Sequence, residues 1–263
     1  MSALVRVGNV DLEVAWVGNA PLDAPVIVFL HEGLGSLSMW RDFPARLCEA
    51  AGLRGLVYSR AGYGRSTPRA PDERWNPDFM HRHAREVLPA LLDTVGVQAP
   101  CFLFGHSDGG SIALIHAASF PDRVAAAIVL APHIMVEEFG LESIRKAREV
   151  FLRTDFKAKL ARHHADVDSA FWGWNDIWLD PRFKQWSIES LLPAIRCPIL
   201  AMQGRDDEYG TMAQIDGIAA ALPAARLLKL ERCAHSPHRD QPDKVIAATI
   251  EFIDRVAHRR VAV

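Results

Sequence analysis

The stretch Cys101-Phe-Leu-Phe-Gly-His-Ser-Asp-Gly-Gly110 decides the fold. Its first four residues form an apolar run typical of a buried strand, and the residues after Gly110 have the apolar composition of a buried helix. Between them, Gly105-His-Ser-Asp-Gly109 matches G-x-S-x-G, in which a serine stands on a tight turn from a strand into a helix. The sequence therefore predicts a strand, a turn and a helix, with Ser107 at the apex of the turn.

This turn also predicts chemistry. A tight strand-to-helix turn forces its central residue into a strained conformation, and glycines at 105 and 109 remove Cβ atoms that would clash with the neighbouring strand and helix. The Ser107 hydroxyl should then stand clear of the sheet, where it can act as a nucleophile. The N–H of Asp108, at the start of the helix, should face a developing oxyanion.

The alternation of apolar runs and helical patterns extends along the chain. Residues 4–17 alternate around Gly8-Asn9 and predict a β-hairpin, at which the sheet starts antiparallel. Further strands are predicted over residues 26–30, 55–59, 101–105, 124–131, 199–203 and 226–230, and helices over residues 78–94, 109–119, 212–222 and 242–258. This order predicts an α/β fold, with a mostly parallel central sheet and helices on both faces.

Residues 133–195 interrupt the alternation, because they contain no clear apolar strand run and are rich in charge and tryptophan. We expect a helical cap, or lid, inserted into a core made of residues 1–132 and 196–263. Trp172, Trp174 and Trp178 lie in this insertion. Their helical spacing is typical of core packing, and the functional alternative is that they wall an apolar substrate pocket.

A serine hydroxyl is a poor nucleophile until a base takes its proton, so a histidine and an acid should follow Ser107. Gln203-Gly-Arg-Asp-Asp-Glu-Tyr209 and Cys233-Ala-His-Ser-Pro-His238 each follow a predicted strand. His235 is predicted to be the base because it comes soon after its strand. Asp207 holds the acid position of G-x-x-D, whereas Asp206 should point to solvent or cap the following loop.

The other histidines are given structural roles. His238 is expected to support its loop by hydrogen bonding, and a metal shared by His235 and His238 finds no further ligand motif nearby. We interpret four further histidines by default as surface or lid residues, namely His81, His83, His163 and His164. No metal and no cofactor is predicted.

Composition limits the partners. Thirty basic against 32 acidic residues in 263 give a net charge of −2, which favours neither nucleic acid nor an anionic membrane as a partner. The N-terminus lacks the apolar core of a signal peptide and no later run could cross a bilayer, so a cytoplasmic protein with a small-molecule substrate is expected. The four cysteines are scattered and are expected to be reduced. The oligomeric state is not predicted.

With these motifs in order, the chain resembles the α/β-hydrolase superfamily, in the subgroup with a small helical cap, over nearly its whole length. His31-Glu-Gly-Leu-Gly35 is similar to the family's H-G-x-x-G oxyanion loop. The resemblance implies that Gly33, or alternatively Leu34, donates the second oxyanion amide. Glu32 replaces the usual glycine and brings a carboxylate near the site. Ser59-Arg-Ala-Gly-Tyr-Gly-Arg-Ser66 resembles the family's D-x-R-G-x-G-x-S structural turn.

The resemblance also implies a reaction. Relatives that hydrolyse epoxides or haloalkanes carry Asp as the nucleophile, so Ser107 implies acyl transfer to water through an acyl-enzyme. We expect the substrate to be a carboxylic ester or thioester with a small, apolar or aromatic acyl group. Its pocket is expected to be lined by Glu32, Leu34 and the three tryptophans. In relatives resembling valacyclovir hydrolase an Asp after the nucleophile binds an ammonium, so an aminoacyl ester remains open through Asp108. Carbon–carbon bond hydrolysis and a ligand sensor of the same fold also remain open.

Overall fold

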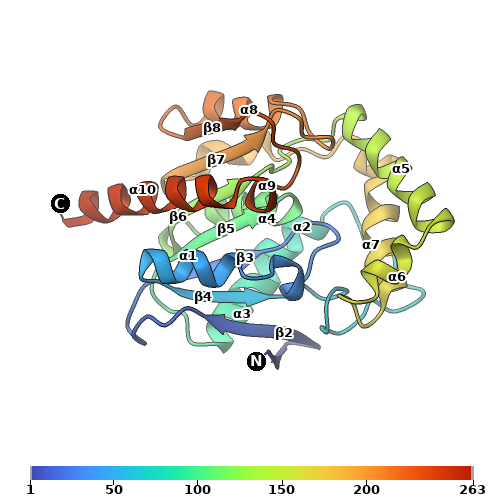
Figure 1. Ribbon diagram of the computed structural model, residues 1–263, viewed down its shortest axis with the longest axis horizontal. Helices are drawn as coiled ribbons and strands as arrows, with labels where there is room; N and C mark the ends of the chain where they lie inside the picture. The colour runs from blue at the N-terminus through green and yellow to red at the C-terminus, as the bar shows by residue number, and fades with distance from the viewer. Residues whose placement is uncertain (1, 262–263) are drawn as a thin grey trace.

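The computed structural model describes the backbone of residues 2–261 and the side chains of residues 2–258. In this part of the chain eight strands form one sheet, in the order β1-β2-β4-β3-β5-β6-β7-β8 (Figure 1). The strands are β1 (Ala3–Val7), β2 (Val10–Val17), β3 (Val26–Leu30), β4 (Arg54–Tyr58), β5 (Cys101–His106), β6 (Val124–Leu130), β7 (Ile199–Gly204) and β8 (Arg226–Leu230). The β1–β2 and β2–β4 pairings are antiparallel and the other five are parallel, so the mostly parallel sheet and its N-terminal hairpin are confirmed.

Helices cover both faces of the sheet, as predicted. They are α1 (Phe43–Ala51), α2 (Phe79–Arg82), α3 (Leu88–Thr94), α4 (Asp108–Ser119), α5 (Glu138–Arg153), α6 (Phe156–Leu160), α7 (Val167–Trp178), α8 (Ala213–Ala221), α9 (Pro237–Asp240) and α10 (Pro242–Val261). Helices α1 and α10 pack on one face, and α3, α4 and α8 pack on the other (Figure 1). The two layers of helices together enclose the central strands of the sheet.

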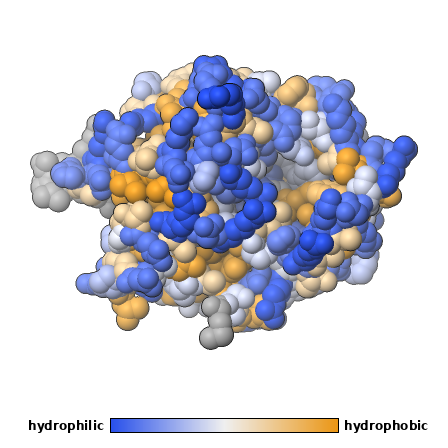
Figure 2. Space-filling view, in the orientation of Figure 1, coloured by the Kyte–Doolittle hydropathy of each residue, from blue (hydrophilic) through white to orange (hydrophobic). Residues whose placement is uncertain are grey.

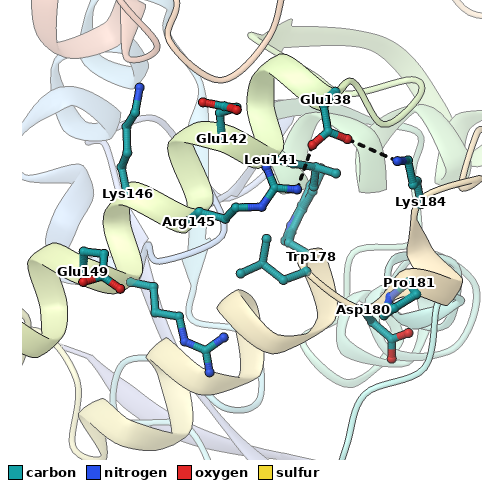
Figure 3. Close-up of a pocket in the computed structure, with 12 residues that line it drawn as sticks. Glu138, Leu141, Glu142, Arg145, Lys146, Glu149, Trp178, Asp180, Pro181 and Lys184 are labelled. Atoms are coloured by element: carbon teal, nitrogen blue, oxygen red, sulfur yellow. Dashed lines mark hydrogen bonds and ion pairs between the residues drawn. The ribbon is translucent and has the colours of Figure 1, made fainter.

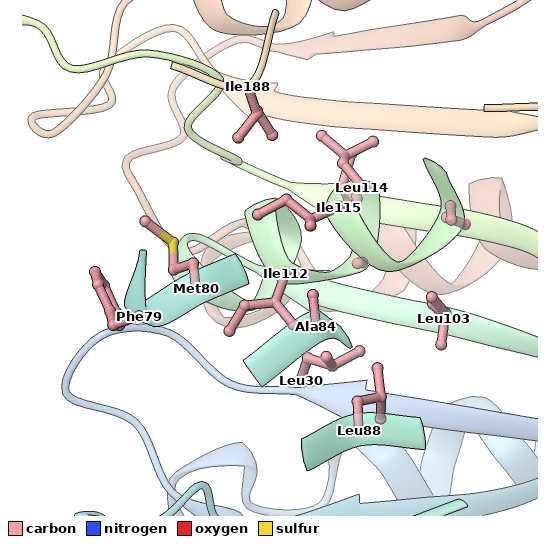
Figure 4. Packing of buried hydrophobic residues seen from close by; sticks show 14 of the residues in the cluster. Leu30, Phe79, Met80, Ala84, Leu88, Leu103, Ile112, Leu114, Ile115 and Ile188 are labelled. Carbon is pink, nitrogen blue, oxygen red and sulfur yellow. The ribbon is translucent and has the colours of Figure 1, made fainter. Parts of the chain in front are cut away.

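Helix α4 lies within the core on its face of the sheet. It is mainly apolar all round and is buried along its length up to Ala117. Its residues Ile112 and Ile115 pack between the sheet and the helical segment that contains Met80 and Leu88 (Figure 4). A helix that is apolar all round belongs in a core. The start of α4 is therefore held rigidly against the carboxyl ends of β3 and β5.

Three α-helical elements differ from the sequence prediction. Helix α1 was not predicted, although it buries Phe43, Leu47 and Cys48 against the sheet, and neither was the short helix α9. The helix predicted over residues 78–94 contains a π-helical turn, His83–Val87, between α2 and α3. Pro89 follows this turn, and its ring would clash with a carbonyl four residues earlier in a regular α-helix, which accounts for the wider turn.

Residues between β6 and β7 form α5, α6 and α7, together with 3₁₀ turns at Pro181–Phe183 and Glu189–Ala194. These three helices lie beside the carboxyl ends of the parallel strands (Figure 1). Hydrophilic residues cover most of the face seen in Figure 2, with small hydrophobic patches between them. Within residues 2–261, no helix has the length and apolar character needed to cross a membrane.

Candidate active site

Ser107 occupies a strained turn between β5 and α4. Its φ of 53° and ψ of −120° lie in a backbone region that residues other than glycine rarely adopt. A Cβ at Gly109 would collide with the carbonyl of Leu30, and one at Gly105 would collide with the backbone of Gly109. The two glycines therefore allow α4 to approach the sheet closely, as predicted. The Ser107 N–H donates to Leu130 O at 2.9 Å, which fixes the turn to β6.

His235 and Asp207 lie on the loops that follow β8 and β7, and the fold brings them together. The Nδ1 of His235 lies 2.8 Å from Oδ1 of Asp207. Because a carboxylate accepts there, Nδ1 carries the ring proton and Nε2 is left free to accept one. Asp206, the alternative acid, is exposed.

Backbone and side-chain donors hold the Asp207 carboxylate in place. Oδ1 also accepts the N–H of Tyr209 at 2.9 Å, and Oδ2 accepts from Nε2 of Gln203 at 3.0 Å. Burial alone would raise the pKa of Asp207, but the adjacent His235 and the Tyr209 N–H outweigh it and lower that pKa. Conversely, burial would lower the pKa of His235, and the carboxylates of Asp207 and Glu208 raise it above the ordinary value.

Ser107 and His235 open into the same small cavity, of about 150 Å³. Its walls combine aromatic and aliphatic side chains with a few polar groups. The lining residues are Glu32, Gly33, Leu34, His106, Ser107, His133, Ile144, Trp174, Trp178, Glu208, Tyr209, His235 and Ser236. The cavity therefore has the mixture of apolar walls and convergent polar groups that is usual for a small-molecule site.

A larger hollow of about 760 Å³ lies over α5 and α7 (Figure 3). It is lined mainly by charged side chains at the surface, among which Glu138 bonds Arg145 and Lys184. Exposed ion pairs of this kind contribute little to binding or stability. Neither Ser107 nor His235 lines this hollow, although Trp178 lines both. We therefore place the candidate site in the smaller cavity.

The predicted pocket residues are only partly brought together. Glu32, Leu34, Trp174 and Trp178 line the cavity, and a Cβ on Gly33 would collide with the ring of Trp174. Trp172 is not among the lining residues. Its ring packs edge-on against Phe151 and Phe171, with the guanidinium of Arg148 5.1 Å from its centre.

Asp108 is buried and engaged within the protein. Trp178 Nε1 donates to its Oδ1 at 3.2 Å, and Nη2 of Arg60 lies 3.5 Å from its Oδ2. Burial raises the pKa of this carboxyl, and the Arg60 charge opposes that effect only in part. The side chain of Asp108 is not among those that line the cavity.

The Glu32 carboxylate is also engaged. It lies 3.4 Å from Nδ1 of His106 and 3.2 Å from Nη2 of Arg239. Burial would raise the pKa of Glu32, but the adjacent His106 ring and, after it, the charge of Arg239 hold that pKa well below the usual range. Glu32 therefore contributes a fixed negative charge at the edge of the cavity.

Two histidine predictions, for His238 and His83, were wrong. Among the described residues, the ring nitrogens of buried His238 have no hydrogen-bond partner, and the ring instead packs 4.8 Å from both Trp40 and His106. His83, outside residues 133–195, is buried rather than exposed, while His164 lies within residues 133–195, as predicted, and is buried there. Nδ1 of His164 accepts the Gly64 N–H, and its Nε2 donates to Leu34 O at 3.1 Å. His164 thus links residues 133–195 to the loop that holds Leu34.

Several lining or supporting residues were missed by the sequence analysis. They are Arg60, His106, His133, Ile144, Gln203, Glu208, Tyr209 and Ser236. Arg60 had one available signal, since it is a charged residue directly after the strand predicted over residues 55–59. The carboxyl ends of parallel strands are where such residues meet a site.

Comparisons with known proteins agree with this architecture. A family model described as the alpha/beta hydrolase family matches residues 27–248. RutD of Pseudomonas savastanoi pv. phaseolicola, a candidate carbamate hydrolase, is 29% identical over 254 residues, which cover 88% of this chain and 95% of RutD. Serine hydrolase BPHL of Mus musculus is 26% identical over 268 residues, which cover 96% of this chain and 86% of BPHL.

A solved structure shows the same fold. The enol-lactonase of Burkholderia xenovorans LB400 superimposes with a TM-score of 0.77 over 96% of this chain and 100% of its own, at 20% sequence identity. At this level of identity the likeness establishes the arrangement of the elements. Catalytic roles therefore have to be argued from the residues of this chain.

Proposed function

Because the chain belongs to the alpha/beta hydrolase family, we propose that it is a serine hydrolase that cleaves esters or thioesters of small acyl groups. The observation that carries this proposal is one small cavity that holds both Ser107 and His235. Ser107 stands there on a strained turn, and His235 is bonded through Nδ1 to Asp207. A nucleophile, a base and an orienting acid in this arrangement are the parts that acyl transfer requires.

The reaction would proceed in two halves. Nε2 of His235 takes the proton of the Ser107 hydroxyl as Oγ attacks the acyl carbon, and the N–H groups of Gly33 and Asp108 stabilise the oxyanion. His235 then gives that proton to the leaving alkoxide or thiolate. In the second half His235 takes a proton from water as the water oxygen attacks the acyl carbon. The bond between that carbon and Ser107 Oγ then breaks, the carboxylic acid leaves, and His235 returns the proton to Oγ. Asp207 stabilises the imidazolium in both halves.

The cavity supports a small acyl group. A volume of about 150 Å³ accommodates a group on the order of a benzene ring, and Leu34, Ile144, Trp174 and Trp178 give it apolar walls. We assign residues 133–195 the role of a cap, since α7 supplies both tryptophans. A small carbamate is the second candidate, because RutD matches over nearly its whole length.

A panel of acyl donors tests the proposal. We expect repeated turnover of p-nitrophenyl acetate, propionate and benzoate, and at least about tenfold lower kcat/KM for the octanoate because its chain exceeds the cavity. Phenyl carbamate, an acyl thioester and an aminoacyl ester complete the panel. Preference for the octanoate would contradict the small acyl site, and release of only one equivalent of product would favour a ligand sensor.

The aminoacyl alternative is tested by Asp108→Asn. Because Arg60 and Trp178 already engage the Asp108 carboxylate, we expect the substitution to destabilise the fold by about 3–5 kcal/mol by leaving the buried Arg60 unpaired. The kcat/KM values for neutral and aminoacyl esters should fall by the same factor. Urea unfolding and kinetics on both substrates measure this. A selective loss on aminoacyl esters, with unchanged stability, would instead make Asp108 an ammonium receptor.

The pH profile of kcat/KM tests the base. His235 must be neutral to accept a proton, and its raised pKa means that neutrality is lost at a higher pH than for an ordinary histidine. Activity should therefore fall with decreasing pH through a midpoint above about 6.5. His133 does not interfere, since burial and the nearby His235 lower its pKa to about 3. An acid limb below about pH 6 would contradict the assignment.

A further inference from the structure

Arg60 is a fully buried arginine just after the carboxyl end of β4, in contact with the loop after β3 and with the start of α4, which carry the proposed oxyanion donors. Its Nη2 donates to the carbonyl of Glu32 at 2.9 Å and lies 3.5 Å from Oδ2 of Asp108. Its guanidinium also lies 4.8 Å from the centre of the Tyr63 ring. One side chain therefore contacts both the Glu32–Gly33 peptide and the residue that follows Ser107.

The Glu32 carbonyl receives two further donors. Nδ1 of His31 lies 2.7 Å from this oxygen, and the Gly35 N–H donates to it at 3.1 Å. Glu32 C=O and Gly33 N–H belong to one peptide group, and in a trans peptide these two bonds point in opposite directions. Donors gathered on the carbonyl side therefore aim the Gly33 N–H away from themselves, and Gly33 lines the cavity.

Arg60 also sets the tautomer of His31. The Arg60 backbone N–H donates to Nε2 of His31 at 3.0 Å, so Nε2 is an acceptor and Nδ1 carries the proton that reaches Glu32 O. Burial, followed by the charge of Arg60, holds the pKa of His31 well below its usual value. The ring is therefore neutral and its donor is fixed. The Arg60 side chain thus acts on the Glu32 carbonyl directly, and the Arg60 backbone N–H acts on it through His31.

We propose that Arg60 is a positioning residue for the oxyanion hole, which orients the Gly33 N–H through the Glu32 carbonyl and holds Asp108 beside it. A charge-assisted bond to the carbonyl also polarises the peptide, which makes its N–H a stronger donor. The inference rests on the proposed function, because it takes the Gly33 and Asp108 amides as oxyanion donors. Arg60 itself contacts neither the acyl group nor Ser107 in this role.

Two variants test the proposal. Arg60→Lys keeps a buried positive charge, but its shorter side chain ends one bond before the position of Nη2, the nitrogen that contacts both Glu32 O and Asp108. Arg60→Met with Asp108→Asn removes both charges together, so no unpaired charge is left to unfold the chain. Arg65→Met, an exposed arginine in the same loop, is the matched control.

Relative to its parent, wild type or Asp108→Asn, each Arg60 variant should lose about ten- to a hundredfold in kcat with KM changed less than threefold. Its affinity for a trifluoromethyl ketone, whose tetrahedral adduct places an oxyanion in the hole, should fall by the factor lost in kcat/KM. Arg65→Met should match wild type. A merely structural role would reduce the folded fraction without changing either value per active site.

Two outcomes separate the failures. Folded Arg60 variants with kcat and ketone affinity within twofold of their parents would overturn the role of Arg60 and leave the proposed function standing. Wild-type protein that turns over no acyl donor of the panel would overturn the proposed function, and this inference with it.

Discussion

Replacing Ser107 by alanine is expected to lower kcat/KM for short-chain esters by about a thousandfold or more, with the fold unchanged. The substitution removes one hydroxyl oxygen, and that hydroxyl makes no capping bond to α4. Alanine meets the same backbone strain at φ 53°, so that strain is not altered. Steady-state kinetics and thermal unfolding of the purified variant measure both halves of the expectation.

Ser119→Ala is the matched control, because it removes a hydroxyl from the opposite end of α4, far along the helix from the cavity. It should retain wild-type kinetics. Wild-type turnover by a folded Ser107→Ala protein would show that the nucleophile lies elsewhere.

Asp207→Asn is expected to lower kcat by about 10⁴-fold, while Asp206→Asn changes it less than about threefold. The Asp207 carboxylate accepts from His235 and Tyr209 on one oxygen and from Gln203 on the other. An amide turns one of these acceptors into a donor, so His235 is held in the wrong tautomer or Gln203 faces another donor. Asp206 is exposed, which makes its variant a control of the same chemistry.

The acid limb of the pH profile should also move. Without the Asp207 charge, burial is the dominant influence on His235 and lowers its pKa, so the midpoint shifts to lower pH. The reverse order of the two variants would assign the acid to Asp206. Equal and small effects would point to an acid on another strand.

Much of the fold could be predicted because its signals are local. Each buried strand is an apolar run, and the Gly105 and Gly109 pair identifies the turn whatever the rest of the chain does. Helix α1 escaped prediction because its apolar residues, Phe43, Leu47 and Cys48, form a short amphipathic pattern rather than a continuous run. The π-helical turn depends on where Pro89 falls within an otherwise helical pattern.

The candidate triad could be predicted for the same reason, since Ser107, Asp207 and His235 each follow the end of a strand and the carboxyl ends of parallel strands meet at one edge. Contacts between segments that are distant in sequence could not be predicted. Arg60 and Asp108 are 48 positions apart, and nothing near either residue indicates the other. His164 bonds Gly64 across 100 positions, so its burial leaves no local pattern.

The locations of the α7 tryptophans could be predicted in part, because their angular positions around the helix distinguish Trp172 from the other two. At about 100° per residue, Trp174 and Trp178 lie within about 40° of each other around the helix, whereas Trp172 lies about 200° from Trp174. The structure agrees, with Trp174 and Trp178 at the cavity and Trp172 against Phe151. The positions of the tryptophans around the helix therefore separate Trp172 from the other two, although the sequence does not indicate which residues Trp172 packs against.

The central claim is that Ser107 forms the covalent acyl-enzyme, and active-site labelling with a fluorophosphonate tests it most directly. Intact-mass spectrometry should show one adduct per chain, and the labelled peptide should carry the adduct on Ser107. Turnover of p-nitrophenyl acetate should disappear in proportion to labelling, and the Ser107→Ala protein should remain unlabelled. An adduct on another residue, or full turnover by a fully labelled protein, would contradict the account.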